Sequence, residues 1–209
     1  MTFIWDQHNK QLLSPHCRQC RDPHFQRISE DFEPAGCCRY EPVFTLFELW
    51  KMVRSGEESF LKKEIWNHPQ NHIYEYEIIA GAHMHSSFYE KREDGSIPSH
   101  VFEQLMGSQH TKYQAVDLRL KYGICPFFIK GEGCGLKPSF KTSICRMFIC
   151  DSIEEALNKK ELEKLHGIQR KVQEEANTFN SFHAGILREK GLDLIRHLDE
   201  VIDYLRQVE

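Results

Sequence analysis

The sequence predicts a mainly α-helical protein with small, irregular β segments. It is organised as a cysteine-containing domain over residues 1–150 and an α-helical hairpin over residues 151–209. Three observations lead to this prediction: apolar residues recur at helical spacing in several stretches, β-type alternation is short, and all eight cysteines precede residue 151. With 209 residues the chain can bury a hydrophobic core without cross-links.

Composition and charge exclude several classes of protein. Hydrophobic residues make up 40% and charged residues 28% of the chain, as in an ordinary globular protein. No stretch approaches the roughly 18 apolar residues of a membrane span, and no basic region with an apolar run opens the chain. We therefore expect no membrane partner, no secretory signal and a cytoplasmic location. The net charge of −4, with scattered Lys and Arg, predicts no nucleic-acid partner.

The first predicted helix begins at Thr45. Thr45 and Glu48 have capping-box spacing, and apolar residues follow at helical intervals. A second, short helix is predicted over residues 57–66, ending before a proline. Residues 72–80 fit a strand or a helix, and residues 91–100 are typical of a polar loop.

The second half of the chain contains one predicted strand and the helical hairpin. Residues 116–122 alternate apolar and polar side chains, which predicts a half-buried strand leading into Cys125. Beyond the last cysteine, Ser152 and Glu155 form another capping box, and a long amphipathic helix follows with a break predicted near residues 178–181. The second hairpin helix carries an apolar stripe that could pack on the first helix, the cysteine domain or another subunit: Leu194, Leu198, Val201 and Leu205.

The cysteines form two blocks of four, Cys17, Cys20, Cys37 and Cys38, then Cys125, Cys134, Cys145 and Cys150. Disulfides bring little to a chain in a reducing compartment, so metal ligation or redox chemistry is the better account. The first two cysteines have C-x-x-C spacing, which lets two thiolates reach one metal ion. Gly36 permits the backbone angles of a ligand loop before the adjacent pair. The glycines between Cys125 and Cys134 predict a hairpin that delivers two more sulfurs.

The cysteines and the arginines beside them could also have roles unrelated to metal ligation. Isolated cysteines are often buried as small hydrophobes, but eight in two tight blocks argue against that. A thioredoxin-like pair at Cys17 and Cys20 would need a preceding strand and a following helix, which the neighbouring prolines disfavour. Arg39 and Arg146 each follow a candidate ligand, where a guanidinium could offset thiolate charge or simply be an ordinary surface arginine.

The motifs Gly36-Cys-Cys-Arg, C-P-F-F from Cys125, G-C-G-L around Cys134 and C-R-M-F from Cys145 resemble the YkgJ-type cysteine-cluster family. The resemblance covers residues 17–150 and implies a zinc- or iron-chelating protein, often with an iron–sulfur cluster. In that family, a doublet of adjacent cysteines occurs together with later cysteines like those of this chain. The chain departs from the family in the sixteen residues between Cys20 and Cys37, and in Lys-Thr where Arg-Pro commonly precedes Cys-Arg.

We therefore expect a metal site, either an iron–sulfur cluster, with 4Fe–4S implied by the resemblance, or zinc. The candidate ligands are Cys37, Cys38, Cys125, Cys134, Cys145, Cys17, Cys20 and Cys150. The motifs indicate no reaction, so whether the protein is an enzyme stays open. Two alternatives are an enzyme related to the protein lysine N-methylases, which carry similar clusters, and a zinc-stapled module that docks a protein partner through its C-terminal helices.

Overall fold

The computed structural model describes residues 3–19, 22, 25, 32, 35–107 and 118–209. The chain divides into two compact units. Unit 1 comprises Met1–Arg18, Pro42–Gly81 and Leu136–Glu209, and unit 2 comprises Gln19–Glu41 and Ala82–Gly135. The domain boundary predicted after residue 150 stays a prediction; unit 1 takes in residues from both sides of it.

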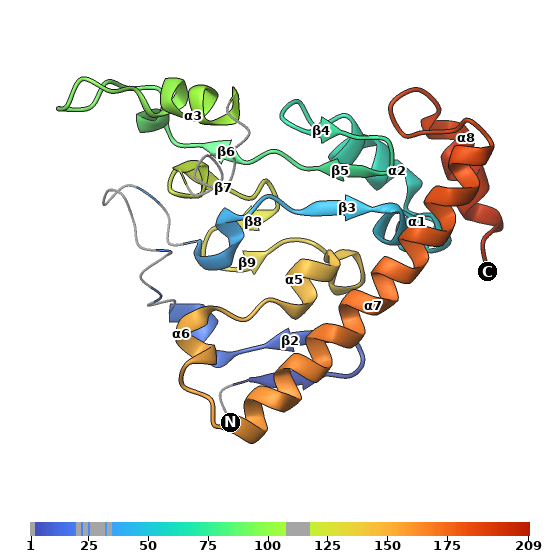
Figure 1. The fold of residues 1–209 in the computed structure, drawn as a ribbon, viewed down its shortest axis with the longest axis horizontal. Coiled ribbons are helices and arrows are strands. Elements are labelled where there is room, and N and C mark those ends of the chain that lie inside the picture. The colour runs from blue at the N-terminus through green and yellow to red at the C-terminus, as the bar shows by residue number, and fades with distance from the viewer. Residues whose placement is uncertain (1–2, 20–21, 23–24, 26–31, 33–34, 108–117) are drawn as a thin grey trace. The chain divides into compact units, whose positions relative to one another are not determined.

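Unit 1 combines helices with two small antiparallel sheets (Figure 1). Its strands are β1 (Ile4–Asp6), β2 (Gln11–Leu13), β3 (Val43–Thr45), β4 (His72–Ile73) and β5 (Glu77–Ile79), paired as β1-β2 and β3-β5-β4. Its helices are α1 (Leu46–Arg54), α2 (Glu58–Phe60), α5 (Ser143–Met147), α6 (Asp151–Glu154), α7 (Lys159–Glu189) and α8 (Leu198–Gln207). Short 3-10 turns η1 (Pro15–Gln19) and η6 (Pro138–Phe140) and the π-helical segment η4 (Leu61–Trp66) complete it.

The described residues of unit 2 form two short antiparallel strand pairs, joined by loops and short helical segments. Its strands are β6 (His83–Met84), β7 (Gly123–Ile124), β8 (Phe128–Ile129) and β9 (Gly133–Cys134), paired as β6-β7 and β8-β9. The helical elements that lie wholly within its described residues include the 3-10 turns η3 (Gly36–Arg39) and η5 (Ser86–Phe88) and the helix α3 (Pro98–Gly107). Together the two units confirm the coarse prediction of helices with small β segments.

Helix α1 begins where the sequence predicted. Thr45 is its N-cap, and the Thr45 N–H donates to Glu48 Oε2 at 3.1 Å in a capping box. Six of its nine residues are buried, among them Leu49 and Met52. The predicted helix over residues 57–66 is also present, as α2 followed by η4. These helices form because capping residues and apolar spacing agree within one local stretch.

Helix α7 corrects two predictions. It begins after Asn158, whose side chain accepts from the Glu161 N–H at 3.1 Å, whereas the predicted start at Ser152 falls in the separate helix α6. The predicted break at residues 178–181 is wrong because α7 runs through it. In that stretch Asn180 Oδ1 accepts from the Phe47 N–H of α1 at 2.9 Å, so its polar side chain serves a tertiary contact.

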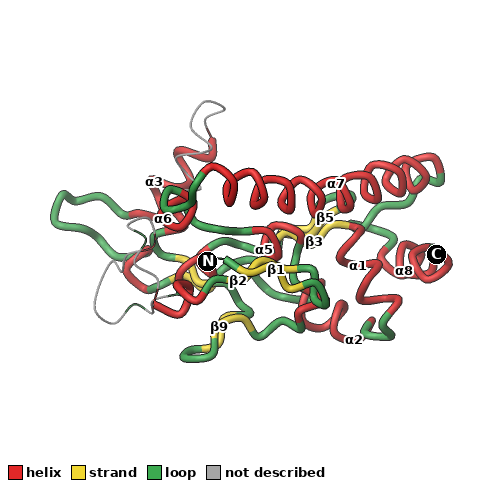
Figure 2. Tube along the Cα trace, turned by 90° about the horizontal axis from the view of Figure 1, so that it is seen from below, coloured by secondary structure: helices red, strands yellow, loops and turns green. Residues whose placement is uncertain are grey.

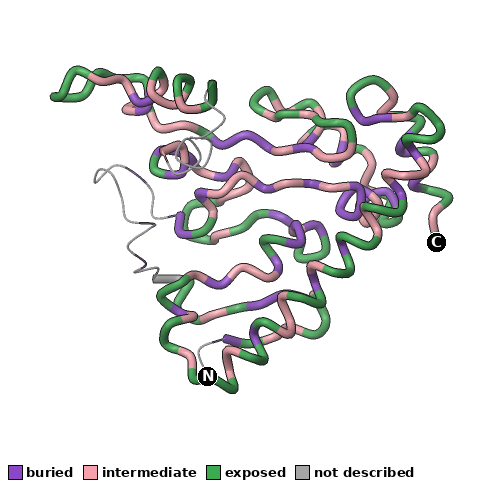
Figure 3. Tube along the Cα trace, in the orientation of Figure 1, coloured by how far each residue is buried: buried purple, intermediate pink, exposed green. Residues whose placement is uncertain are grey.

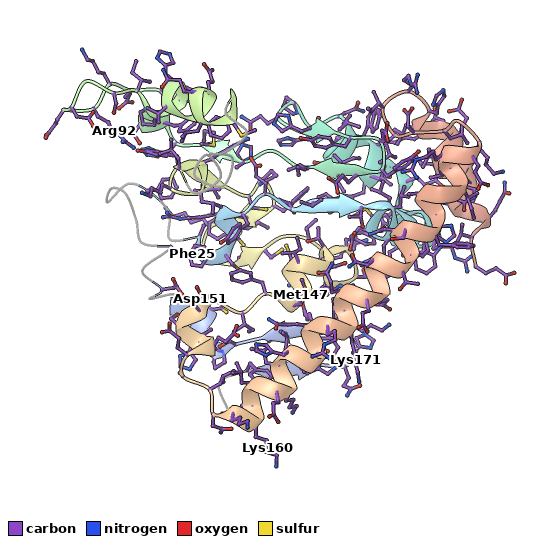
Figure 4. All side chains as sticks on the ribbon, in the orientation of Figure 1. Phe25, Arg92, Met147, Asp151, Lys160 and Lys171 are labelled. Atoms are coloured by element: carbon purple, nitrogen blue, oxygen red, sulfur yellow. The ribbon has the colours of Figure 1, made fainter. Side chains whose placement is uncertain are left out.

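One face of α7 is buried, at Leu165, Val172, Ala176, His183 and Leu187. Figures 1 and 2 show the helix running along unit 1 with α5 beside it, and Figure 3 shows its other face exposed. Met147 of α5 lies next to α7, whereas Lys160 and Lys171 project away (Figure 4). Although α7 has 31 residues, none of the helices in the described part of the chain has an apolar stretch long enough to cross a bilayer.

The apolar stripe that would dock a partner in the interaction-module alternative is buried within unit 1. Leu194, Val201 and Leu205 are fully buried, and Leu198 is half-buried. Both α8 and α7 pack on α1, and α7 touches α8 through the His183 Nδ1 to Tyr204 hydroxyl contact at 2.6 Å. The stripe therefore belongs to the core of unit 1, and a partner that docks on it would find it covered.

The strand expected before the second cysteine block lies elsewhere. Residues 118–120 are helical, Leu120 and Tyr122 are buried, and the strand is β7, immediately before Cys125; Val116 lies outside the described residues. The prediction that this block begins at a strand end is confirmed. Of the two alternatives for residues 72–80, the strand is confirmed, because β4 and β5 both lie there.

Candidate cysteine site

Cys37 and Cys38 lie in the 3-10 turn η3 of unit 2. Gly36 begins the turn with φ of +55°, a left-handed angle that favours glycine, as the sequence predicted. The turn closes through the Cys38 N–H, which donates to Ala35 O at 3.0 Å, and the Tyr40 N–H, which donates to Cys37 O at 3.1 Å. Cys37 is exposed and Cys38 half-buried.

Cys125 lies in the turn between β7 and β8, and Cys134 is the last residue of β9. Cys125 is buried, and its carbonyl accepts from the Phe128 N–H at 3.0 Å. Cys134 is exposed and pairs with Phe128 across the hairpin. Gly133 in the hairpin has φ of +98°, so the turn needs glycine. The prediction of a hairpin in this segment is confirmed for the backbone.

The two cysteine segments of unit 2 are joined directly. The Cys125 N–H donates to Cys38 O with an N···O distance of 2.6 Å. This bond places the adjacent pair next to the start of the hairpin, although the two segments are far apart in the chain. As they stand, no three His, Cys, Asp or Glu side chains among the described residues form a group that could hold a metal ion.

Arg39, next to Cys38, is buried with only 2% of its surface exposed. Its Nη1 donates to Lys121 O at 3.5 Å, and its guanidinium carbon lies 4.5 Å from the centre of the Phe32 ring. The alternative of an ordinary surface arginine is therefore wrong here.

The remaining cysteines belong to unit 1, apart from Cys20, which lies outside the described residues. Cys17 is exposed in η1. Cys145 is exposed in α5, where its N–H donates to the capping Thr142 Oγ1 at 3.3 Å. Cys150 packs against the apolar cluster around Phe3, which favours a packing role. Ligation by these cysteines stays a prediction.

Arg146, which follows Cys145, is also buried, with 3% of its surface exposed. Its Nη2 lies 3.7 Å from Glu175 Oε2, too far for a hydrogen bond, and neither Nε nor Nη2 has a hydrogen-bond acceptor among the described residues. The surface-arginine alternative is wrong at this position too.

Lys51, which no sequence motif marks, lies close to this arginine. Its Nζ is 4.9 Å from the centre of the Phe47 ring, and the Arg146 guanidinium carbon is 5.7 Å from the same ring. The pKa of Lys51 is lowered from 10.5 to about 8, chiefly by burial; Glu48 and Glu175 oppose the shift, and Arg146 contributes to it. The only sequence signal for the burial of Lys51 was its position one helical turn after Phe47, on the apolar side of α1.

Replacing Lys51 with Met should stabilise the protein most at neutral pH. The folded-state pKa lies below the unfolded one, so the burial penalty is full below about pH 8 and fades as the pH rises towards 10.5. After allowance for its partial exposure, we expect K51M to raise the free energy of unfolding by about 1–2 kcal/mol at pH 7 and by less than half of that at pH 10. Urea unfolding of both proteins at the two pH values measures this. An equal gain in unfolding free energy at both pH values would contradict a buried lysine with a lowered pKa.

Comparisons of the chain with protein-family models, with curated proteins and with solved structures each find no match. The resemblance to the YkgJ-type family therefore rests on the cysteine motifs and stays a prediction.

Proposed function

We propose that unit 2 binds a metal centre, either an iron–sulfur cluster or zinc, through four thiolates: those of Cys37, Cys38, Cys125 and Cys134. The observation that carries the proposal is the 2.6 Å hydrogen bond from the Cys125 N–H to Cys38 O. It joins a turn with two adjacent cysteines to a hairpin with two more. Packing alone does not require four thiols in so small a region.

The chemistry of the donors fits such a centre. Zinc and iron–sulfur clusters both accept four cysteine thiolates, and both are commonly held by short hairpins and turns. A cluster would supply electron transfer, and zinc would supply a structural cross-link. Because no three described side chains yet form a ligand group, the thiols would turn towards one another on binding. The exposed positions of Cys37 and Cys134 leave space for this rotation.

Charge balance also supports the proposal. Four thiolates around one metal centre carry excess negative charge, and unit 2 is small and loop-rich. Arg39 follows Cys38 directly and keeps its guanidinium out of water, held by Lys121 O and the Phe32 ring. A fixed cation beside the ligand turn would lower the cost of gathering the thiolates.

Metal analysis of the full chain, purified without air, tests the proposal. We expect iron with sulfide, or zinc, near one centre per chain, with visible thiolate-to-iron charge-transfer absorption in the iron case. Replacing zinc with cobalt should give the visible bands of tetrahedral thiolate coordination. Colourless, metal-free protein that folds normally and takes up neither metal would refute the proposal. An enzyme related to the lysine N-methylases stays a prediction, since no described feature favours it.

A further inference from the structure

Unit 1 contains a concave site whose lining includes no cysteine. It is a pocket of about 550 Å³ between the β4-β5 turn and α7. The turn contributes Tyr74, Glu75, Tyr76 and Glu77, and the opposite wall and floor consist of Thr45, Asn177, Asn180 and Ala184. The lining therefore combines tyrosines and glutamates from the turn with small and amide residues from the other elements.

The floor of the pocket is rigid. Asn180 Nδ2 donates to Thr45 Oγ1 at 2.9 Å, and Asn180 Oδ1 accepts from the Phe47 N–H at 2.9 Å. Thr45 is fixed in turn by the buried carboxylate of Glu48. The turn is closed by the Tyr74 N–H, which donates to Glu77 O at 2.8 Å. Ligand binding would need little reorganisation of this framework.

The carboxylates and the outer tyrosine ring at the mouth are available to a ligand. Across the described residues, neither Glu75 nor Glu77 takes part in an ion pair, and the Tyr74 ring, 50% exposed, has no ring or cation partner. The adjacent Tyr76 already receives a cation, since the Arg188 guanidinium carbon lies 5.5 Å from its ring centre. Arg196 interacts electrostatically with Glu75, but its guanidinium is paired with Asp193 at 2.5 Å.

We propose that this pocket binds an alkylammonium group, with the ammonium between the Glu75 and Glu77 carboxylates and the alkyl stem on the Tyr74 ring. Two carboxylates supply charge, and a tyrosine face attracts cations as well as apolar stems. A free diamine and a lysine side chain share this chemistry. The site is independent of the proposed metal centre.

Calorimetric titration of the full chain with cadaverine tests the proposal, with 1,5-pentanediol as the neutral isostere. We expect cadaverine to bind and the diol not to bind, and we expect 0.5 M salt to weaken binding. The double variant E75Q/E77Q should bind at least about tenfold more weakly, and Y74L about threefold more weakly. The variant E163Q is the control, because it removes one charge from an exposed position of α7 outside the pocket and should bind like wild type.

Titration with N-acetyl-lysine methylamide separates the two sources. Binding within about threefold of cadaverine would support a lysine side chain, and binding more than about tenfold weaker would support a free diamine, whose second ammonium adds to the attraction. Equal binding of diol and diamine, an unaffected E75Q/E77Q variant, or no saturation below about 10 mM would overturn the proposal. None of these results depends on metal content.

Discussion

Cys125→Ser should abolish binding of the proposed metal centre while leaving the backbone link between the two cysteine segments in place. The Cys125 N–H that donates to Cys38 O belongs to the main chain, so the substitution deletes one thiolate and keeps the bond. Loss of one ligand of four lowers metal affinity by about tenfold or more. Metal content after purification without air, alongside circular dichroism, measures the effect. C38S should behave in the same way.

The matched control is Cys150→Ser, at a cysteine that packs against the apolar cluster of unit 1. It should retain the metal and lose only a little stability. Full metal content in C125S would refute its role as a ligand. Equal loss in C150S would show that metal content follows general stability instead.

Glu48→Ala should be among the most destabilising single changes in the chain. Glu48 is 1% exposed, and its Oε1 accepts from the Ser143 N–H at 3.0 Å and the Ser143 hydroxyl at 2.5 Å. Its Oε2 accepts from the Thr45 N–H and hydroxyl. Removing the carboxylate leaves these buried donors without an acceptor, which should cost about 3–5 kcal/mol of unfolding free energy.

Urea unfolding of three variants gives a graded test. Glu48→Gln keeps one acceptor oxygen and should lose less than E48A. Glu58→Ala removes a partly exposed carboxylate that pairs with Arg206 at 2.8 Å and should cost less than about 1 kcal/mol. A cost below about 1 kcal/mol for E48A would contradict the assigned role of its carboxylate.

Glu48 also shows how far sequence reasoning reaches. The capping box with Thr45 is a local pattern, so spacing alone predicted it correctly. The second oxygen caps Ser143, at the start of α5 and far along the chain, and no local pattern encodes that contact. The missed continuity of α7 has the same cause, because Asn180 resembles a helix breaker until its bonds to α1 are known.

At the candidate site, too, local features could be predicted from the sequence and long-range contacts could not. Gly36 and the glycines of the β8-β9 hairpin were predictable, since a positive φ leaves its mark in residue type. The contact between Cys38 and Cys125 was predicted only as a hypothesis from their chemistry. The burial of Arg39 could not be predicted. A Cys-Arg dipeptide has the same sequence whether its arginine is exposed to water or buried.

The interleaving of the two units has a consequence for synthesis of the protein. The chain passes between unit 1 and unit 2 four times, and the last segment of unit 2 ends at Gly135. On the ribosome, Cys37 and Cys38 emerge long before the hairpin that completes the proposed ligand set. Insertion of the proposed centre would therefore wait until most of the nascent chain has been made, and a contiguous fragment that ends before Cys134 would lack one of the four proposed thiolates.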